Sequence, residues 1–254
     1  MRLSASIMLI SLPLVSGAMS ARAQEISGVF NMGALANTMS MGGIIKSECA
    51  RARGIGQRVD SDTPWCGSAA GAQHPFARPL PGAADNTDMR YTASAALRRE
   101  VLAAFIDRVR AKDPKEAGQI EAEFRQHDYN AIYAGIVRPY GLAGDDAASA
   151  QAAYLLLGWM IVHEGQEPPP GSVQGVRAQA AAALSNGRLS EPETRARLGE
   201  NFKILFVVVH AGWQAARREG TLDRYAAGVA DVFRNGDGLD LRTAQLTRNG
   251  FRSS

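Results

Sequence analysis

The sequence predicts an all-α protein, a compact bundle of about seven helices with a long central helix, preceded by an irregular Gly/Pro-rich segment. From Tyr91 onward, apolar residues recur at steps of three and four. The stretches between these runs are short and begin with residues that cap helices. The same region contains neither a strand pattern of convincing length nor a repeat of fixed period.

The first 23 residues have the layout of a secretory signal peptide. Arg2 precedes an apolar segment from Ile7 to Val15, and Ala21-Arg22-Ala23 forms a small-x-small cleavage site before Gln24. The apolar segment is too short for a membrane span, and the alternative is a buried N-terminal helix. We expect cleavage between Ala23 and Gln24, and a periplasmic or secreted mature protein with no membrane span.

Export also changes the charge of the protein. Removal of residues 1–23 takes away two arginines and no acidic residue, so the net charge falls from +3 to about +1. A nearly neutral protein has little bulk electrostatic attraction for nucleic acid or for anionic lipid. We therefore expect its partner to be a protein or an envelope component, and not a nucleic acid.

Residues 24–90 are predicted to form an irregular arm. They contain nine glycines and four prolines and show little helical periodicity after Lys46. Such a segment buries too little apolar surface to offset the entropy of ordering its backbone. Within it, Ile26 to Ile45 forms a short helix or lies over the domain, and Ala77 to Asp88 is a linker.

The only two cysteines, Cys49 and Cys66, both lie in this arm. An even number of cysteines in an oxidising compartment favours a disulfide, and the loop of about 18 residues would contribute roughly 3 kcal/mol. The alternative is two free thiols. The spacing is not C-x-x-C, so the sequence does not indicate a thioredoxin-like redox role.

Residues 91–254 are predicted to form the helical domain, and its helix starts can be placed from capping residues. Thr92 caps the first helix, and Asp113 followed by Pro114 starts the second. The third runs from Asp128 to Val137 with Ile132 and Ile136 one turn apart, and it ends before Pro139.

The fourth helix is capped by Asp145 and has almost no polar face between Tyr154 and Val162. Ser172 opens the fifth helix, which Asn186-Gly187 ends, and Thr221 caps the last one. The tail from Leu239 to Phe251 carries several large apolar residues, so we expect it to return across the bundle.

The central helix is predicted from Ser190 to Gly220. Ser190 and Glu193 have the spacing of a capping box. The run from Ile204 to Val209 is apolar on every side, which is typical of a buried helix. Its natural partner is the fourth helix, so we expect the segments that contain Trp159 and Trp213 to form the core.

Several short segments in the helical half have a distinctive order and spacing along the chain. They are Tyr91-Thr92-Ala93-Ser94, Leu97-Arg98-Arg99, Asp113-Pro114, Pro139-Tyr140-Gly141-Leu142, Val176-Arg177-Ala178-Gln179-Ala180, Gly238-Leu239-Asp240-Leu241, Leu246-Thr247 and Gly250-Phe251. Together they resemble an uncharacterised family of exported bacterial helical proteins, domain of unknown function 6683. The resemblance covers roughly Tyr91 to Phe251 and implies an α-helical periplasmic or secreted module. It implies no activity and no catalytic residues.

No metal or cofactor site is expected from the sequence. Four histidines are present (His74, His127, His163 and His210), but no closely spaced pair on one helix face occurs among them. His163-Glu164 with Glu167 comes nearest to a ligand set, although a histidine at a helix C-terminus is also explained by the macrodipole. His210 fits a core histidine better than a metal ligand.

Catalytic motifs are equally scarce. The chain has no G-x-S-x-G motif and no phosphate-binding glycine loop. Carboxylates that converge only in three dimensions are the remaining route to an enzyme, as in a hydrolase that acts on the cell wall. Candidates for that role are Glu121, Glu123, Glu164 and Glu200.

A binding role requires only an accessible surface. Met32, Met39 and Met41 form an adaptable apolar group that docks on a partner or on the protein's own bundle. A cluster of three arginines is either a solvated loop or a docking patch for an acidic partner: Arg51, Arg53 and Arg58. We expect an exported, non-enzymatic helical binding or interaction module, with a periplasmic hydrolase acting through acidic residues as the alternative.

Overall fold

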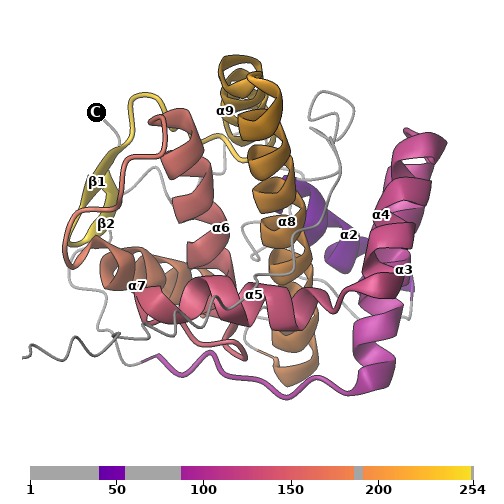
Figure 1. The fold of residues 1–254 in the computed structure, drawn as a ribbon. Helices are drawn as coiled ribbons and strands as arrows, with labels where there is room; N and C mark the ends of the chain where they lie inside the picture. The colour runs from indigo at the N-terminus through magenta and orange to yellow at the C-terminus, as the bar shows by residue number, and fades with distance from the viewer. Residues whose placement is uncertain (1–39, 55–86, 186–190, 253–254) are drawn as a thin grey trace, which may run out of the picture.

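A computed structural model describes residues 40–54, 87–185 and 191–252. In these ranges the chain forms eight α-helices, one turn of 3-10 helix and a hairpin of two three-residue strands. Figure 1 shows the helices packed as a bundle, with the hairpin at its edge. The predicted all-α class and the seven helices expected after Tyr91 are confirmed.

The centre of the bundle is the pair formed by α6 (Ala147–Val162) and α8 (Pro192–Glu219), which lie side by side in Figure 1. α6 is buried along almost its whole length. α8 is buried continuously from Ala196 to Val209, because the other helices cover it on several sides. The prediction that these two apolar segments form the core is confirmed.

Two of the predicted helix starts are correct. α4 (Pro114–Gln126) begins after Asp113, whose carboxylate accepts a hydrogen bond from the backbone N–H of Glu116 at 2.9 Å. α5 (Tyr129–Val137) begins after Asp128, whose side chain caps the helix in the same way. α5 ends before Pro139 and passes into the 3-10 turn η1 (Arg138–Tyr140).

Two other predicted caps are displaced by one or two residues. α3 (Ala95–Arg110) is capped by Ser94 and not by Thr92, since the Ser94 hydroxyl accepts from Leu97 N–H at 3.1 Å. α6 is capped by Asp146 and not by Asp145. The carbonyl of Asp145 accepts instead from Tyr91 N–H at 2.9 Å, so a contact distant in sequence decides between two adjacent aspartates.

The N-cap of the central helix is Glu191, one residue after Ser190 of the predicted capping box. α8 begins at Pro192, and the Glu191 side chain makes no capping hydrogen bond. Glu193 pairs with Arg197 at 3.1 Å instead of closing a box. Proline is favoured at the first helical position, because its missing N–H is not needed there. Ser190 lies outside the described residues.

The irregular arm expected over residues 24–90 contains the helix α2 (Met41–Gly54), which overlaps only the end of the short helix considered for Ile26 to Ile45. It extends beyond Lys46, where the sequence shows little periodicity, and Ile44 and Ile45 are fully buried against the bundle. Asp237 fixes its start by accepting from Gly42 N–H at 2.9 Å. A weakly patterned segment is helical here because the bundle supplies its apolar contacts. The remainder of the arm lies outside the described residues.

The remaining helices start where the sequence placed them. α7 (Ser172–Leu184) and α9 (Leu222–Gly236) follow Gly171 and Thr221, respectively. The Asn186-Gly187 end predicted for α7 lies outside the described residues. In the described part of the chain, none of the helices combines the length and the apolar character that crossing a membrane requires.

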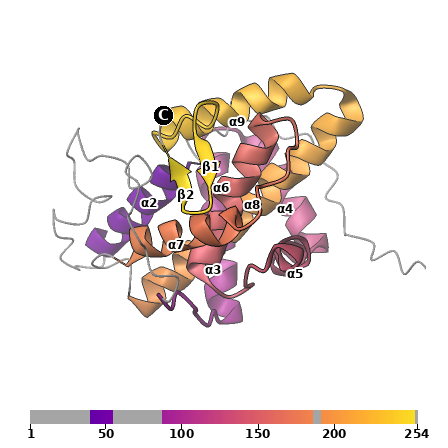
Figure 2. The same ribbon diagram turned by 90° about the vertical axis from the view of Figure 1, so that its left-hand side faces the viewer.

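The tail returns across the bundle, as predicted, and buries Leu239, Leu241 and Phe251. It also forms an antiparallel hairpin that the sequence did not indicate, with strands β1 (Gln245–Thr247) and β2 (Gly250–Arg252). Figure 2 shows this hairpin lying next to α7.

Candidate functional site

A group of buried charged and polar side chains surrounds Glu200, on α8. Its side chain is inaccessible to solvent and accepts hydrogen bonds from the hydroxyls of Tyr91 at 2.9 Å and Tyr129 at 2.6 Å. Lys203, one turn further along α8, places its Nζ 2.6 Å from the Glu200 carboxylate. We call these four residues the Glu200 cluster.

Gly199 makes the Glu200 cluster sterically feasible. A Cβ atom at this position would lie 2.3 Å from the ring of Tyr91. Only glycine therefore lets the tyrosine ring lie against α8 closely enough for its hydroxyl to reach Glu200.

Lys203 extends the Glu200 cluster to two further parts of the chain. Its ammonium group donates to the side chain of Asn130 at 2.5 Å and to the carbonyl of Gly144 at 3.2 Å. Burial lowers the pKa of Lys203, while the neighbouring Glu200 acts in the opposite direction. Burial and Glu200 raise the pKa values of Tyr91 and Tyr129 far above the ordinary range. The Glu200 cluster joins α8 to α5 and to the segment before α3 through buried polar contacts, and Arg98 adds a second cation 3.8 Å from the Glu200 carboxylate.

The other candidate carboxylates do not join Glu200. Glu121 lies on the surface of α4 and pairs with Arg110 and Arg125. Glu123, on the same helix, lies 3.9 Å from His127. Glu164 is exposed just beyond the end of α6. The acidic residues proposed for a hydrolase are thus distributed over separate elements.

The histidines within the described ranges are also separate from one another. His163 caps the C-terminus of α6 and stacks on Trp159, with 4.3 Å between the ring centroids. Its ring nitrogen contacts the carbonyl of Trp159, which is the helix-end role that the sequence indicated. Across the described residues, no group of three His, Cys, Asp or Glu side chains is arranged to hold a metal ion. His74 lies outside these ranges.

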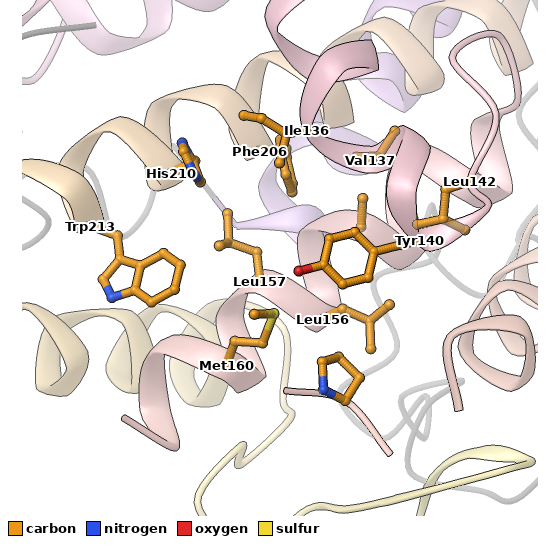
Figure 3. Close-up of a pocket in the computed structure, with 12 residues that line it drawn as sticks. Ile136, Val137, Tyr140, Leu142, Leu156, Leu157, Met160, Phe206, His210 and Trp213 are labelled. Atoms are coloured by element: carbon orange, nitrogen blue, oxygen red, sulfur yellow. The ribbon is translucent and has the colours of Figure 1, made fainter. Parts of the chain in front are cut away.

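An open pocket lies where α5, η1, α6 and α8 meet, beside the loop that follows α6 (Figure 3). Its volume is about 80 Å³. Tyr140 and Trp213 lie at opposite sides of the pocket, and Leu157 and Met160 lie between them. The remaining lining residues are Ile136, Val137, Leu142, Ala153, Leu156, Pro168, Phe206 and His210. None of the lining side chains carries a carboxylate, an ammonium or a guanidinium group.

His210 is the only ionisable group besides Tyr140 in the pocket wall. Burial, assisted by the positive charge of Arg217, lowers the pKa of His210 to about 4. The imidazole is therefore neutral at ordinary pH, and its Nε2 lies 3.2 Å from the amide nitrogen of Gln214. Its ring stacks with Phe206 and meets Trp213 edge to face. The prediction of a core histidine is correct in its chemistry, although His210 also borders an open space.

Opposite charges lie next to the pocket on its two sides. Arg217 holds its guanidinium carbon 5.6 Å from the centroid of the Trp213 ring. On the other side, the Tyr140 hydroxyl donates to the carboxylate of Glu167 at 3.3 Å. Tyr140 is one of the two large apolar side chains in the described ranges that are classed as exposed.

The sequence did not reveal this pocket. The segment that contains Trp213 is predicted to form the core, and the structure leaves Trp213 itself half-buried. The only available signal was the Pro139-Tyr140-Gly141 segment, in which a large aromatic residue sits in a tight turn with Gly141 at φ 70°.

Four predicted features fall wholly or partly outside the described residues. The cleavage site between Ala23 and Gln24 lies wholly outside them, as do Met32 and Met39 of the methionine group. Cys49 is buried in α2 with 5% of its surface exposed, while Cys66 lies outside the described ranges. The signal peptide and the disulfide therefore stay predictions. Of the arginine cluster, Arg51 pairs with Glu48 at 2.9 Å, and Arg58 lies outside the described ranges.

Comparison with known proteins does not add a relative. No protein-family model, no curated protein and no solved structure matches this chain. The resemblance to the uncharacterised family of exported helical proteins accordingly stays a prediction, and function has to be argued from the pocket and its surroundings.

Proposed function

We propose that this protein is an exported helical binding module that recognises a protein partner by holding one apolar side chain in the pocket between Tyr140 and Trp213. The observation that carries the proposal is the pocket itself, an open space with an uncharged wall. Buried aromatic or aliphatic anchors that fill such pockets dominate the affinity of many protein interfaces.

The size of the pocket favours a side chain over a complete ligand. Sites that enclose small molecules commonly have volumes of about 300–1,000 Å³. The volume here is about 80 Å³. A space of this size accepts one ring or one branched aliphatic group, and the rest of the partner then lies across the surrounding surface.

The chemistry of the wall favours binding over hydrolysis. A periplasmic hydrolase acting through acidic residues needs carboxylates beside its substrate. The lining residues include none, and Glu200 is engaged inside the bundle by Tyr91, Tyr129 and Lys203. The hydrolase alternative therefore has less support.

The export part of the proposal rests on the sequence. The first 23 residues have the order of segments found in signal peptides, and the predicted Cys49–Cys66 bridge suits an oxidising compartment. The resemblance to exported helical proteins points the same way.

A titration with N-acetylphenylalaninamide tests the pocket directly. We expect a dissociation constant on the order of 1 mM, since a single side chain supplies the contact. The ring should shift the NMR signal of the Met160 methyl group. N-acetylglycinamide, which lacks the side chain, should leave that signal unchanged.

Two variants distinguish pocket binding from non-specific contact. Ala153→Leu fills the pocket from α6, and Ala131→Leu makes the same change at an exposed position of α5. Only the first should abolish the Met160 shift. Trp213→Ala, which removes one wall, should weaken binding about tenfold, whereas Leu222→Ala, at an exposed apolar side chain elsewhere, should not. Equal binding by Ala153→Leu and the unchanged protein would contradict the proposal.

A further inference from the structure

The positive charge of Arg217, next to the pocket, indicates which charge the partner carries. Arg217 is exposed and lies over Trp213, one of the pocket walls. Within the described part of the chain, no carboxylate forms an ion pair with it, whereas Arg197, on the same helix, pairs with both Glu100 and Glu193. Arg217 is thus a cation held beside an apolar opening, with its charge available to a partner.

The field of Arg217 reaches the pocket. Its positive charge contributes to the lowered pKa of His210, which lines the wall. The wall itself contains no charged group, so Arg217 acts on the pocket from just outside the wall. The other side is negative, since Glu167 lies there in contact with Tyr140. An acidic group on the partner is therefore favoured on the Trp213 side and disfavoured on the Tyr140 side.

The wall also has a preference for the shape of the anchor. Phe206, His210 and Trp213 present ring faces and edges to the space, and Tyr140 lies across from them (Figure 3). Aromatic pairs in offset or edge-to-face geometry gain about 0.5–1.5 kcal/mol beyond their buried area. A planar aromatic side chain uses these rings better than an aliphatic one of equal size.

We propose that the partner is a protein segment that presents an aromatic side chain to the pocket and an acidic side chain, close to it in sequence, to Arg217. This inference rests on the proposed function, and it names the chemistry of the group that the pocket recognises. Arg217 is then a specificity-determining residue, and the aromatic wall supplies most of the affinity.

Three peptides of equal length test the inference on the full chain: Ac-Asp-Phe-Asp-NH₂, Ac-Asn-Phe-Asn-NH₂ and Ac-Lys-Phe-Lys-NH₂. Binding is measured by the Met160 methyl signal at low salt. We expect the aspartate peptide to bind about threefold more tightly than the asparagine peptide, as is usual for one exposed ion pair. The lysine peptide should bind most weakly, and high salt should remove the differences.

Variants of α8 assign the effect to one residue. Arg217→Gln should remove the preference for the aspartate peptide over the asparagine peptide. Arg218→Gln, an identical change at the next exposed position, should preserve the difference. Arg218→Gln should not alter binding of N-acetylphenylalaninamide by more than about twofold, because Arg218 lies outside the wall.

The outcomes separate the two proposals. If the asparagine and aspartate peptides bind equally to the unchanged protein, the inference about Arg217 fails and the binding function stands. If no peptide shifts the Met160 signal, the proposed function fails as well. A Met160 signal that changes with protein concentration and not with peptide would assign the pocket to a second copy of the chain and overturn both.

Discussion

Glu200 and Lys203 show how a charged pair can belong to the core of a helical protein. Both side chains are at most 1% exposed, and each has partners on other elements in addition to the ion pair. Removing two charges from water is costly, and this cost is offset only when the remaining bonding positions are satisfied. Tyr91, Tyr129 and Asn130 satisfy those positions here.

We predict strong coupling between these two residues. Glu200→Gln should lower the free energy of unfolding by about 3 kcal/mol, because it leaves the buried Lys203 ammonium without its counterion. Lys203→Met should cost less, because Arg98, 3.8 Å from the Glu200 carboxylate, remains as a second cation. The double variant should lose clearly less than the sum of the two single losses. Urea denaturation of the four proteins measures the coupling.

The surface pair of Arg125 and Glu121, at 2.7 Å, serves as the control. Arg125→Ala should leave the urea midpoint unchanged within error, because solvent screens an exposed pair. Additive losses for Glu200→Gln and Lys203→Met would show that the Glu200 cluster does not act as a unit.

Among the elements, the contact of α7 with the C-terminal hairpin depends on one small residue. A Cβ atom on Gly175 would lie 2.1 Å from the carbonyl oxygen of Arg248 and 2.6 Å from the backbone nitrogen of Gly250. One turn further along α7, Gln179 accepts from Phe251 N–H at 2.9 Å and donates to the Phe251 carbonyl at 3.1 Å. The amide of Gln179 thus pairs with β2 as a neighbouring strand would.

Gly175→Ala should therefore destabilise the protein, even though alanine is the better helix former. We expect a loss of about 1–3 kcal/mol, because backbone atoms of the hairpin cannot move aside as a flexible side chain does. Chemical denaturation reports the loss, and hydrogen exchange should show weaker protection of Phe251 N–H.

The matched change is Gly118→Ala on α4, where a Cβ atom meets nothing within 4 Å. That variant should be stabilised by about 0.5–1 kcal/mol through helix propensity. If both variants behave alike, close packing at Gly175 does not hold the hairpin.

At the level of the whole molecule, α2 links the N-terminal part of the chain to the bundle. It packs against α8 and α9, and it carries Cys49 at a buried position. A bridge from Cys49 to Cys66 would attach the segment after α2 to a helix that the bundle already holds.

We predict that the exported protein contains the Cys49–Cys66 disulfide and begins at Gln24. Mass spectrometry of the periplasmic fraction should give a mature mass without residues 1–23 and two mass units below the reduced form. Cys66→Ser should lower the free energy of unfolding by roughly 3 kcal/mol, whereas the unchanged protein in reducing agent should match that variant. Recovery of two free thiols after export would contradict the prediction.

Helix positions could be predicted because the interactions that set them lie within a few residues of each other. Asp113 with Pro114 and Asp128 located helix starts correctly, since a cap bonds within the next turn. The local pattern predicted Asp145 as the cap of α6, whereas the cap is Asp146. The pattern could not distinguish them, because Asp146 forms a bridge with Arg90, more than fifty residues away in the chain. Most of the helix α2 escaped prediction for the same reason, as its apolar contacts come from α8 and α9.

The sequence by itself determined the helical class, the central pair of apolar helices and most of the helix boundaries, because periodicity and capping are local properties. Only the tertiary structure decided that Glu200 is buried in contact with Tyr91, Tyr129 and Lys203, and that Tyr140 faces Trp213 across an open space. Those two aromatic residues are separated by two helices in the chain, and their distance is set by how α5, α6 and α8 pack. Packing between distant segments has no signature in the local pattern of residues, so the binding pocket emerged only in three dimensions.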